Sequence, residues 1–391
     1  MLTTPRRATL FALLVACAAI GGAFRAAQPR AQYAILSDRI LDPRTGQYSA
    51  PSVILVGKGR ITHVLPAAQY RSDVADSTID LRGLTVSPGL IDAHVHLGIG
   101  GQPAANALAD LRAGFTTVVD LGARTQRILR VRDSINAGLI AGPRVLAAGL
   151  WIGIKGGVCE FNGLGIAGGA DEFRARVREN VEGGADVIKL CVSGWPNEAF
   201  SAPEKYELTD GVIAAVMDES RKRNRMVIAH DISLGGVQAA LRAGVKGFAH
   251  TPYLDSNTAV QLREQNAFII PTLATLTGSD SSPASQALVN SLALAHRTGV
   301  TIVFGTDGGV LPHGRNAEEL AALERAGLRP LEAIRAATMH AARTLGLADS
   351  VGVLSRGMMA DLIAVQGDPL ADLTALKAPR FVMSRGRVVV P

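Results

Sequence analysis

Short apolar runs alternate with helix-like segments through the middle of the chain. Eight of these runs are typical of β-strands, at residues 90–96, 116–120, 144–150, 186–192, 226–230, 247–250, 268–271 and 302–306. Between most of them, apolar residues recur at helical spacing, as in residues 170–181 and 210–223. Parallel strands joined by helical crossovers predict an α/β fold, and eight of them predict a (β/α)8 TIM barrel over residues 86–350. A doubly wound Rossmann sheet is the alternative, but no Gly-x-Gly-x-x-Gly motif opens a helix after the first strand.

The two ends of the chain show a different pattern, in which short apolar runs are separated by turn residues. Within residues 33–85, such runs lie at 34–36, 52–56, 61–65 and 78–81. Residues 351–391 return to the same style, with runs at 361–365, 381–383 and 387–390. We therefore expect both ends of the chain to build one small β-sandwich domain beside the barrel.

The first 27 residues have the pattern of an export signal. Two arginines stand near the start, and the apolar stretch at residues 8–20 is too short to span a membrane. The sequence Leu-Val-Ala-Cys that ends at Cys17 resembles a bacterial lipobox, in which Cys17 would carry lipid as the first mature residue. Cleavage at an ordinary small-residue site is the alternative. The protein is therefore predicted to be exported, as a periplasmic, secreted or lipid-anchored protein.

The composition of the chain indicates which kinds of molecule the protein binds. The 391 residues are 48% hydrophobic, which is enough for a sizeable core. The formal net charge is +6, but aromatic residues make up only 4%, so no platform for stacking nucleic-acid bases is evident. The dense basic run at residues 221–225 ends a predicted helix, where cations are favoured. We expect a small-molecule substrate, no nucleic-acid partner, and no membrane contact beyond the candidate anchor at Cys17, and the composition leaves a homo-oligomer open.

Cys159 and Cys191 are the other two cysteines of the chain. Cys191 lies two residues after Lys189 on the same predicted strand, so the two side chains should face the same interior. Small buried thiols are the favoured interpretation of these cysteines. A disulfide between them is the alternative that export would permit.

Residue types that bind metals stand at the ends of the predicted strands. His94 and His96 close the first strand one residue apart, so both rings project from one face. The others follow in chain order at the ends of strands four, five, six and eight: Lys189, His230, His250 and Asp307. The carboxyl ends of barrel strands carry the chemistry, so these six side chains should converge. Four imidazoles and one carboxylate suit divalent metal ions, with Zn2+ as the favoured identity.

Lys189 is the unusual member of this set, because an ammonium group would repel a metal cation. Burial would depress the pKa of the amine. A neutral amine reacts with CO2 to give a carbamate, which is a carboxylate analogue able to bridge two cations. We therefore predict two divalent metal ions, a carbamate on Lys189, and a bridging hydroxide activated by the metals. Asp307 is the predicted catalytic residue, a metal ligand that also accepts the proton of the hydroxide.

Three further residues are candidates for contact with the substrate. His313 and Arg315 follow the eighth strand on the active-site side, where an arginine can hold a carboxylate through two hydrogen bonds. Tyr253, three residues after His250, is the third.

Taken together, these motifs resemble the amidohydrolase superfamily from about residue 33 to the end of the chain. The residues that carry the resemblance are the two histidines 94 and 96, the segment 185–190, His230, and the segments 247–250 and 305–307. Segments 114–122, 142–146, 333–338 and 360–370 look most like the branch of metal-dependent dipeptidases related to imidazolonepropionase and prolidase.

The resemblance implies a barrel with a flanking β domain, a binuclear site and a carboxylated Lys189. It also implies that His94, His96 and Asp307 bind one metal, and that His230 and His250 bind the other. Two loops depart from the family pattern and put specificity in question. Val158 stands about where the family often has a histidine, and residues 193–197 differ from the usual pair of glycines.

The predicted activity is hydrolysis of an amide bond in a small molecule, with a dipeptide or an N-acyl amino acid as the favoured substrate. A cyclic amide, lactone or imidazolone is the alternative substrate class. A mononuclear deaminase fits less well, because Lys189 would then have no role. The alternative outside the enzymes is an exported metal-binding lipoprotein without activity, which the intact set of ligand types argues against.

Overall fold

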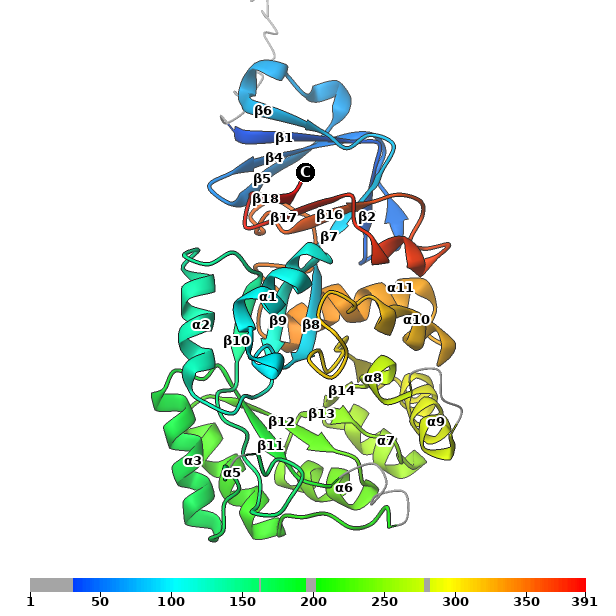
Figure 1. Ribbon diagram of the computed structural model, residues 1–391. Helices are drawn as coiled ribbons and strands as arrows, with labels where there is room; N and C mark the ends of the chain where they lie inside the picture. Colours follow the sequence, from blue (N-terminus) through cyan, green and yellow to red (C-terminus); the bar gives the residue numbers. More distant parts are fainter. Residues whose placement is uncertain (1–30, 162, 195–201, 278–281) are drawn as a thin grey trace, which may run out of the picture.

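The computed structural model describes residues 31–161, 163–194, 202–277 and 282–391, so the predicted signal segment and Cys17 lie outside the described residues. Figure 1 shows a β domain stacked on one end of a larger α/β body. Among the helices of the described ranges, none has both the length and the apolar character needed to cross a bilayer.

The α/β body contains, within the described residues, eight parallel strands in two hydrogen-bonded sheets. One sheet has β8 (Leu90–Val95), β9 (Phe115–Asp120) and β10 (Arg144–Ala147). The other has β11 (Val187–Cys191), β12 (Met226–Asp231), β13 (Gly247–His250), β14 (Phe268–Ile270) and β15 (Thr301–Ile302). Each strand pairs in parallel with its neighbour along the chain within its sheet.

Backbone hydrogen bonds join the two sheets at both edges. On one side the N–H of Asp186 donates to the carbonyl of Ala147 at 2.8 Å, which links β10 to the start of β11. On the other side the N–H of Ala93 donates to the carbonyl of Phe304 at 2.9 Å, which links β8 to the chain after β15. The eight strands therefore form a closed ring, and the predicted (β/α)8 barrel is confirmed.

Helices cover the outside of this ring. They are α1 (Pro103–Arg112), α2 (Arg127–Asn136), α3 (Ala170–Glu182), α5 (Asp210–Lys222), α6 (Leu234–Ala243), α7 (Ser256–Glu264), α8 (Leu273–Thr277), α9 (Pro283–Thr298), α10 (Glu318–Arg325), α11 (Pro330–Arg335) and α12 (Ala341–Thr344). The helices predicted at 170–181 and 210–223 are α3 and α5. Side-chain caps fix several helix starts, as where Asp255 accepts a hydrogen bond from the N–H of Thr258 at 2.7 Å.

The strands of the barrel are buried on both faces, which explains their continuous apolar sequences. Every residue of β8, β9, β11 and β13 is buried. Phe115 and Phe304 stack with ring centroids 5.3 Å apart and help to fill the interior. The few polar side chains at the carboxyl ends of these strands are therefore drawn into a dry environment.

The β domain consists, in the described chain, of two packed sheets. A four-stranded sheet has the order β5 (Arg60–Pro66), β4 (Ser52–Gly57), β1 (Ala31–Ser37) and β6 (Ala75–Asp80). A six-stranded sheet has the order β18 (Arg387–Val390), β17 (Phe381–Ser384), β16 (Leu362–Val365), β7 (Thr85–Pro88), β2 (Arg39–Asp42) and β3 (Gln47–Tyr48). In Figure 1 the six-stranded sheet lies nearer the barrel.

Both ends of the chain contribute to this domain, because β7 pairs antiparallel with β16 across the six-stranded sheet. One buried apolar cluster joins the two sheets, with Ile35 and Ile54 from the first and Leu362 and Phe381 from the second. The predicted β-sandwich from both chain ends is confirmed. β7 leads directly into β8, so the domain also fixes the start of the first barrel strand.

Candidate active site

The structure brings the six predicted ligand side chains together at the carboxyl ends of the barrel strands. His94 lies on β8 and His96 directly after it, Lys189 on β11, His230 on β12, His250 on β13, and Asp307 follows β15. All six line one cavity of about 150 Å3. We call these six residues the floor of the cavity.

Three ligand atoms of the floor form a compact triangle. His94 Nε2 lies 3.3 Å from His96 Nε2 and 3.3 Å from Asp307 Oδ1, and His96 Nε2 lies 3.1 Å from Asp307 Oδ1. Two ligands of a tetrahedral zinc ion, each at about 2.0–2.1 Å from the metal, are separated by roughly 3.3–3.4 Å. His94, His96 and Asp307 are thus spaced to hold a metal ion.

The other three floor residues surround this triangle. Lys189 Nζ lies 3.2 Å from His94 Nε2. The ring centroids of His230 and His250 are 4.7 Å apart, and those of His94 and His250 are 5.3 Å apart. The amine therefore borders the triangle, and His250 lies between the rings of His94 and His230.

Hydrogen bonds behind the rings set their orientation. His96 Nδ1 lies 2.9 Å from the carbonyl oxygen of Gly122, to which it can only donate, so its Nε2 is the free acceptor. His250 Nδ1 lies 2.7 Å from Thr272 Oγ1. In both rings the Nδ1 contact leaves Nε2 available to a cation.

A buried carboxylate, Asp92, locks the triangle from behind. Its Oδ2 accepts from Thr306 Oγ1 at 2.6 Å and from Asn316 Nδ2 at 2.8 Å. Its Oδ1 accepts from the N–H groups of His94 and Thr306, each at 3.1 Å. Asp92 therefore fastens the residue before Asp307 to the strand that carries His94. Burial raises the pKa of Asp92 to about 7, even though these hydrogen bonds lower it.

The backbone at the floor is closely packed and locally strained. A Cβ on Gly305 would lie 2.3 Å from Ile270 Cγ2 and 3.0 Å from the backbone nitrogen of His94, so only glycine permits this approach. The N–H of Asp307 then donates to the carbonyl of His94 at 2.7 Å. Asp307 and His250 both have positive φ, at 60° and 78°. Such strain in non-glycine residues is concentrated at functional sites.

Burial and neighbouring groups shift the pKa values of several floor residues. It lowers the pKa of Lys189 to about 7. Burial, and after it the charge of Lys189, lowers the pKa of His230 to about 3 and holds that of His94 well below its ordinary value. Burial alone would raise the pKa of Asp307, but the neighbouring imidazoles hold it well below the ordinary value. Neutral imidazoles, an ionised carboxylate and a readily deprotonated amine are the states that metal binding requires.

The side of the cavity is formed by loop residues that we call the wall: Trp151, Val158, Cys159 and Phe161. Cys159 is bonded to Cys191, with Cα atoms 6.2 Å apart. The interpretation of these cysteines as free buried thiols is therefore wrong. The two cysteines lie 32 residues apart in sequence. The loop after β10 folds back over β11 and so brings their side chains within bonding distance.

The predicted substrate contacts are not placed as expected. His313 does not line the cavity: its Nδ1 lies 2.9 Å from Asp110 Oδ2, and its Nε2 lies 3.4 Å from the carbonyl oxygen of His96. Arg315 is exposed and pairs with Glu318, with Nε 2.6 Å from Oε1. Both nitrogens of His313 thus face protein atoms, so it supports the floor from behind, whereas the guanidinium of Arg315 is turned toward a helix.

Tyr253 also lies outside the residues that line the cavity. Its hydroxyl is buried with no hydrogen-bond partner among the described residues, and burial raises its pKa. Of the loop at 193–197, Ser193 donates to Asp231 Oδ1 at 2.8 Å, while residues 195–197 lie outside the described residues.

Arg124 is a charged cavity residue that the sequence analysis did not identify. Its guanidinium carbon lies 5.8 Å from the centroid of the Phe161 ring, and its exposed side chain lines the mouth of the cavity. The available signal was its position four residues after the end of β9, on the face where barrel loops carry function.

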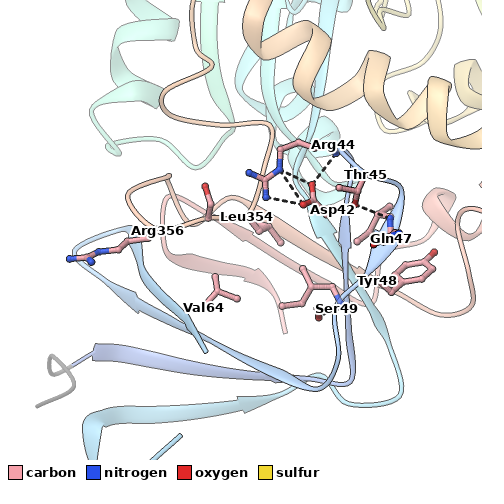
Figure 2. A pocket seen from close by; sticks show the side chains of 12 residues that line it. Asp42, Arg44, Thr45, Gln47, Tyr48, Ser49, Val64, Leu354 and Arg356 are labelled. Carbon is pink, nitrogen blue, oxygen red and sulfur yellow. Dashed lines mark hydrogen bonds and ion pairs between the residues drawn. The ribbon is translucent and has the colours of Figure 1, made fainter. Parts of the chain in front are cut away.

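A second cavity, of about 480 Å3, lies in the β domain beside β2 and β3 (Figure 2). Two of its charged side chains are paired with each other, since Arg44 donates to both carboxylate oxygens of Asp42 at 2.8–3.1 Å. No cluster of ligand types comparable to the floor is found among its lining residues. The chemistry of the described chain is therefore centred on the barrel.

Comparison with known proteins agrees with this geometry. The chain is 28% identical to ochratoxinase of Aspergillus niger, over 91% of this chain and 86% of that protein. A solved Xaa-Pro dipeptidase with bound methionine in its active site superposes with a TM-score of 0.85 and 27% identity, covering 91% of this chain and 99% of that one. A putative prolidase from Bifidobacterium longum gives a TM-score of 0.82 and 30% identity, covering 91% and 94%.

These neighbours are prolidase-like, which confirms the predicted branch and supports hydrolysis of an amide bond. The model of the amidohydrolase family matches residues 85–389, which span the whole barrel and the last strands of the β domain. The chain therefore belongs to the amidohydrolase family.

Proposed function

We propose that this protein is a hydrolase with two divalent metal ions that cleaves the amide bond of a dipeptide or an N-acyl amino acid. The observation that carries the proposal is the triangle of His94, His96 and Asp307, with the Lys189 amine 3.2 Å from one of its corners. Prolidase-like neighbours and ochratoxinase support the reaction class.

The residues present fit two cations better than they fit a metal-free site. Several nitrogen atoms and a carboxylate oxygen crowd within 3.3 Å in a dry interior. A cation would neutralise the carboxylate and accept the ring lone pairs. His94, His96 and Asp307 would hold one ion, His230 and His250 the other, and the carbamate of Lys189 both.

Lys189 has the properties that carbamate formation requires. Lys189 is 2% exposed, and burial lowers the pKa of its amine to about 7. A large fraction of the amine is therefore neutral near pH 7. The neutral amine attacks CO2 and loses a proton, leaving a carboxylate at the end of the side chain. The site thereby gains an anionic ligand where an ammonium group would oppose metal binding.

Bound metals would polarise the substrate carbonyl and lower the pKa of water to near neutrality. The protein supplies the rest. Asp307 stays ionised in the folded protein, so it can accept the proton of the attacking water. The bond from Asp307 N–H to the His94 carbonyl keeps this carboxylate beside both imidazoles. The same group can then pass the proton to the leaving amine.

Arg124 is the residue we assign to the free carboxylate of the substrate. It is the charged side chain at the cavity mouth among the described lining residues outside the floor. Its ring contact with Phe161 holds the guanidinium above the cavity while leaving its N–H groups free to donate. This assignment replaces Arg315, whose guanidinium is already paired with Glu318.

The deciding experiment is turnover of a panel of dipeptides and N-acyl amino acids by protein that has been stripped with a chelator and then reloaded with Zn2+. We expect activity only after reloading, and about two ions per chain. Reloaded protein that hydrolyses lactones or cyclic amides but no linear amide would move the assignment to the alternative substrate class. Reloaded protein inactive on every class would favour the metal-binding lipoprotein.

We also propose that the protein is exported, through the signal-like segment that ends near Cys17. The Cys159–Cys191 disulfide supports this, because such bonds persist mainly in oxidising compartments. A Cys17→Ser variant should lose lipid attachment and leave the membrane fraction if the lipobox is used. Intact mass of an unmodified N-terminus well beyond residue 17 would leave ordinary secretion instead.

A further inference from the structure

The wall of the cavity differs in chemistry from its floor. The lining residues outside the floor, within the described chain, are apolar except for Arg124 at the mouth: Ile99, Trp151, Val158, Cys159, Phe161 and Val310. Trp151, Val158 and the two cysteines are each less than 7% exposed and form one apolar cluster, with Phe161 packed against it. A substrate group that touches the wall therefore meets mainly apolar side chains.

Contacts on both sides hold the wall in place. The rings of Trp151 and Phe161 lie 4.8 Å apart, and Trp151 lies 5.4 Å from the ring of His96. A Cβ at Gly122 would lie 2.4 Å from the Trp151 ring, so glycine is needed for the indole to reach this place. The N–H of Val158 donates to the carboxylate of Glu207 at 3.0 Å. The wall is therefore built before any substrate arrives.

The disulfide ties this wall to the floor. Cys159 lies in the loop that carries Val158 and Phe161, and Cys191 lies on β11, two residues from Lys189. Alternate residues of a strand point the same way, so the bond anchors the loop to the interior face that carries the amine. Any movement of the loop away from the floor is thus limited by a covalent bond.

The volume of the cavity sets the size of the group that it accepts. A cavity of about 150 Å3 lined by apolar side chains in another protein binds one benzene molecule. The cavity here has about the same volume, 150 Å3, with the floor on one side. Because the floor shares this volume, the wall accepts at most one ring-sized group, and the rest of the substrate extends past Arg124.

We propose that the wall is a specificity subsite for one ring-sized apolar group, aromatic or branched aliphatic, next to the scissile amide, and that the Cys159–Cys191 bond holds this subsite in shape. The inference rests on the proposed function and names its substrate class. A charged group would lose its hydration at the wall without finding a partner, so the subsite rejects acidic and basic side chains.

The first test compares matched substrates of the zinc-loaded protein. Dipeptides that place phenylalanine or glycine on either side of the amide should differ about tenfold or more in kcat/KM at one of the two positions, because the ring buries apolar surface. Aspartate at that position should be worse than glycine. Ratios near one at both positions, with turnover present, would overturn the subsite and leave the proposed function standing.

The second test fills the subsite. Val158→Phe places a ring where the substrate group would lie, and it should lower the phenylalanine-to-glycine ratio of kcat/KM about tenfold without loss of zinc. The matched control is Val64→Phe, because Val64 lies in the β domain and is 36% exposed. That control should keep the ratio of the parent protein. A Val158→Phe variant with an unchanged ratio would contradict the assignment.

The third test removes the disulfide through Cys159→Ala with Cys191→Ala. A loosened wall should raise KM for the ring-bearing substrate about five- to tenfold, with a smaller change in KM for the glycine substrate and an unchanged zinc content. Equal changes in both KM values would mean that the bond serves stability alone. A second variant, Cys159→Ser with Cys191→Ala, keeps a polar side chain of similar size but cannot form the bond. It should show the same rise in KM as the double alanine variant.

A binding measurement separates this inference from the proposed function. Calorimetry with 3-phenylpropanoate and acetate, which carry a free carboxylate but no amide bond to cleave, should show about tenfold tighter binding of the ring-bearing ligand to the zinc-loaded protein. If this difference is found but no amide is cleaved, the subsite stands and the reaction is wrong. If amides are cleaved and the two affinities are equal, the reaction stands and the subsite is wrong.

Discussion

The floor of the cavity is held by strand hydrogen bonds, and its wall is held by apolar packing and a disulfide. On the floor, Asp92 fastens β8 to the segment after β15 that carries Asp307, and the other five ligand positions lie on or directly after a barrel strand. On the wall, Trp151 and Phe161 come from one loop and contact each other. A floor residue can move only with its strand, whereas a wall residue can change without disturbing the barrel.

This difference separates two kinds of function. The floor fixes the reaction, because its side chains must keep their spacing to within a fraction of an ångström to bind cations. The wall and the mouth choose the substrate, because they meet only the group that enters. Substitutions on the floor should therefore affect metal content and kcat, and substitutions on the wall or at the mouth should affect KM.

The largest effect is expected from Lys189→Ala. Loss of the carbamate removes the ligand shared by both ions, so metal and activity should be lost together. Metal analysis and turnover on the same sample check this. Short carboxylic acids can stand in for the missing carbamate, so they should partly restore the metal content and turnover of the variant. Added CO2 has no amine to react with in the variant, so it should raise the activity of the parent protein alone.

A control for this variant is Lys222→Ala, since Lys222 lies on the surface and pairs with Asp218 at 2.8 Å. It should behave as the parent protein does. A Lys189→Ala protein that keeps two metals and full turnover would show that Lys189 carries no metal ligand and that this floor residue does not fix the reaction.

Asp307→Asn should give the second largest effect. The amide keeps the shape of the side chain but cannot accept a proton, so kcat should fall at least about 10²-fold while much of the metal stays bound. Steady-state kinetics with metal analysis measures both. The control is Asp133→Asn, because the side chain of Asp133 is 67% exposed and remote from the floor. Near-normal turnover of Asp307→Asn would end its catalytic role.

A smaller effect is expected at the mouth from Arg124→Gln. Loss of a charge-assisted hydrogen bond should raise KM about tenfold for substrates with a free carboxylate and leave kcat nearly unchanged. The same substrates capped as amides should bind the parent protein and the variant equally weakly. If capping makes no difference to the parent protein, the reaction shifts toward the cyclic-amide or lactone alternative.

The smallest effect is expected from Arg315→Ala. Its side chain is 58% exposed and already paired with Glu318, and an exposed pair of this kind contributes little. KM and kcat should stay within about twofold of the parent values, which makes this variant the matched control for Arg124→Gln. A tenfold rise in KM for Arg315→Ala, with no rise for Arg124→Gln, would mean that Arg315 binds the carboxylate of the substrate.

The position of the floor could be read from the chain because barrel geometry is regular. Alternation along a strand puts His94 and His96 on one face, and the ring of parallel strands brings the ends of β11, β12 and β13 to the same place. The burial of Lys189 followed from its apolar neighbours. These relations depend on the repeat of the strand and on the order of strands, both of which are local properties of the sequence.

The arginine at the mouth could not be found in the same way. Arg124 and Arg315 both follow barrel strands, and that position alone does not show which of them faces the cavity. Arg315 turns away because Glu318 lies one helical turn further on, whereas Arg124 faces the ring of Phe161 from a different loop. That choice depends on contacts between loops far apart in the chain.

The barrel, the β-sandwich made from both chain ends, and the metal-ligand types at the strand ends could be predicted from the chain, because each follows from the period of apolar residues and the chain order of strands. The bond between Cys159 and Cys191, the position of His313 behind the floor, and the apolar side chains of the wall emerged only from the folded arrangement. Loops are positioned by the elements they pack against, and these contacts leave no periodic trace in the sequence.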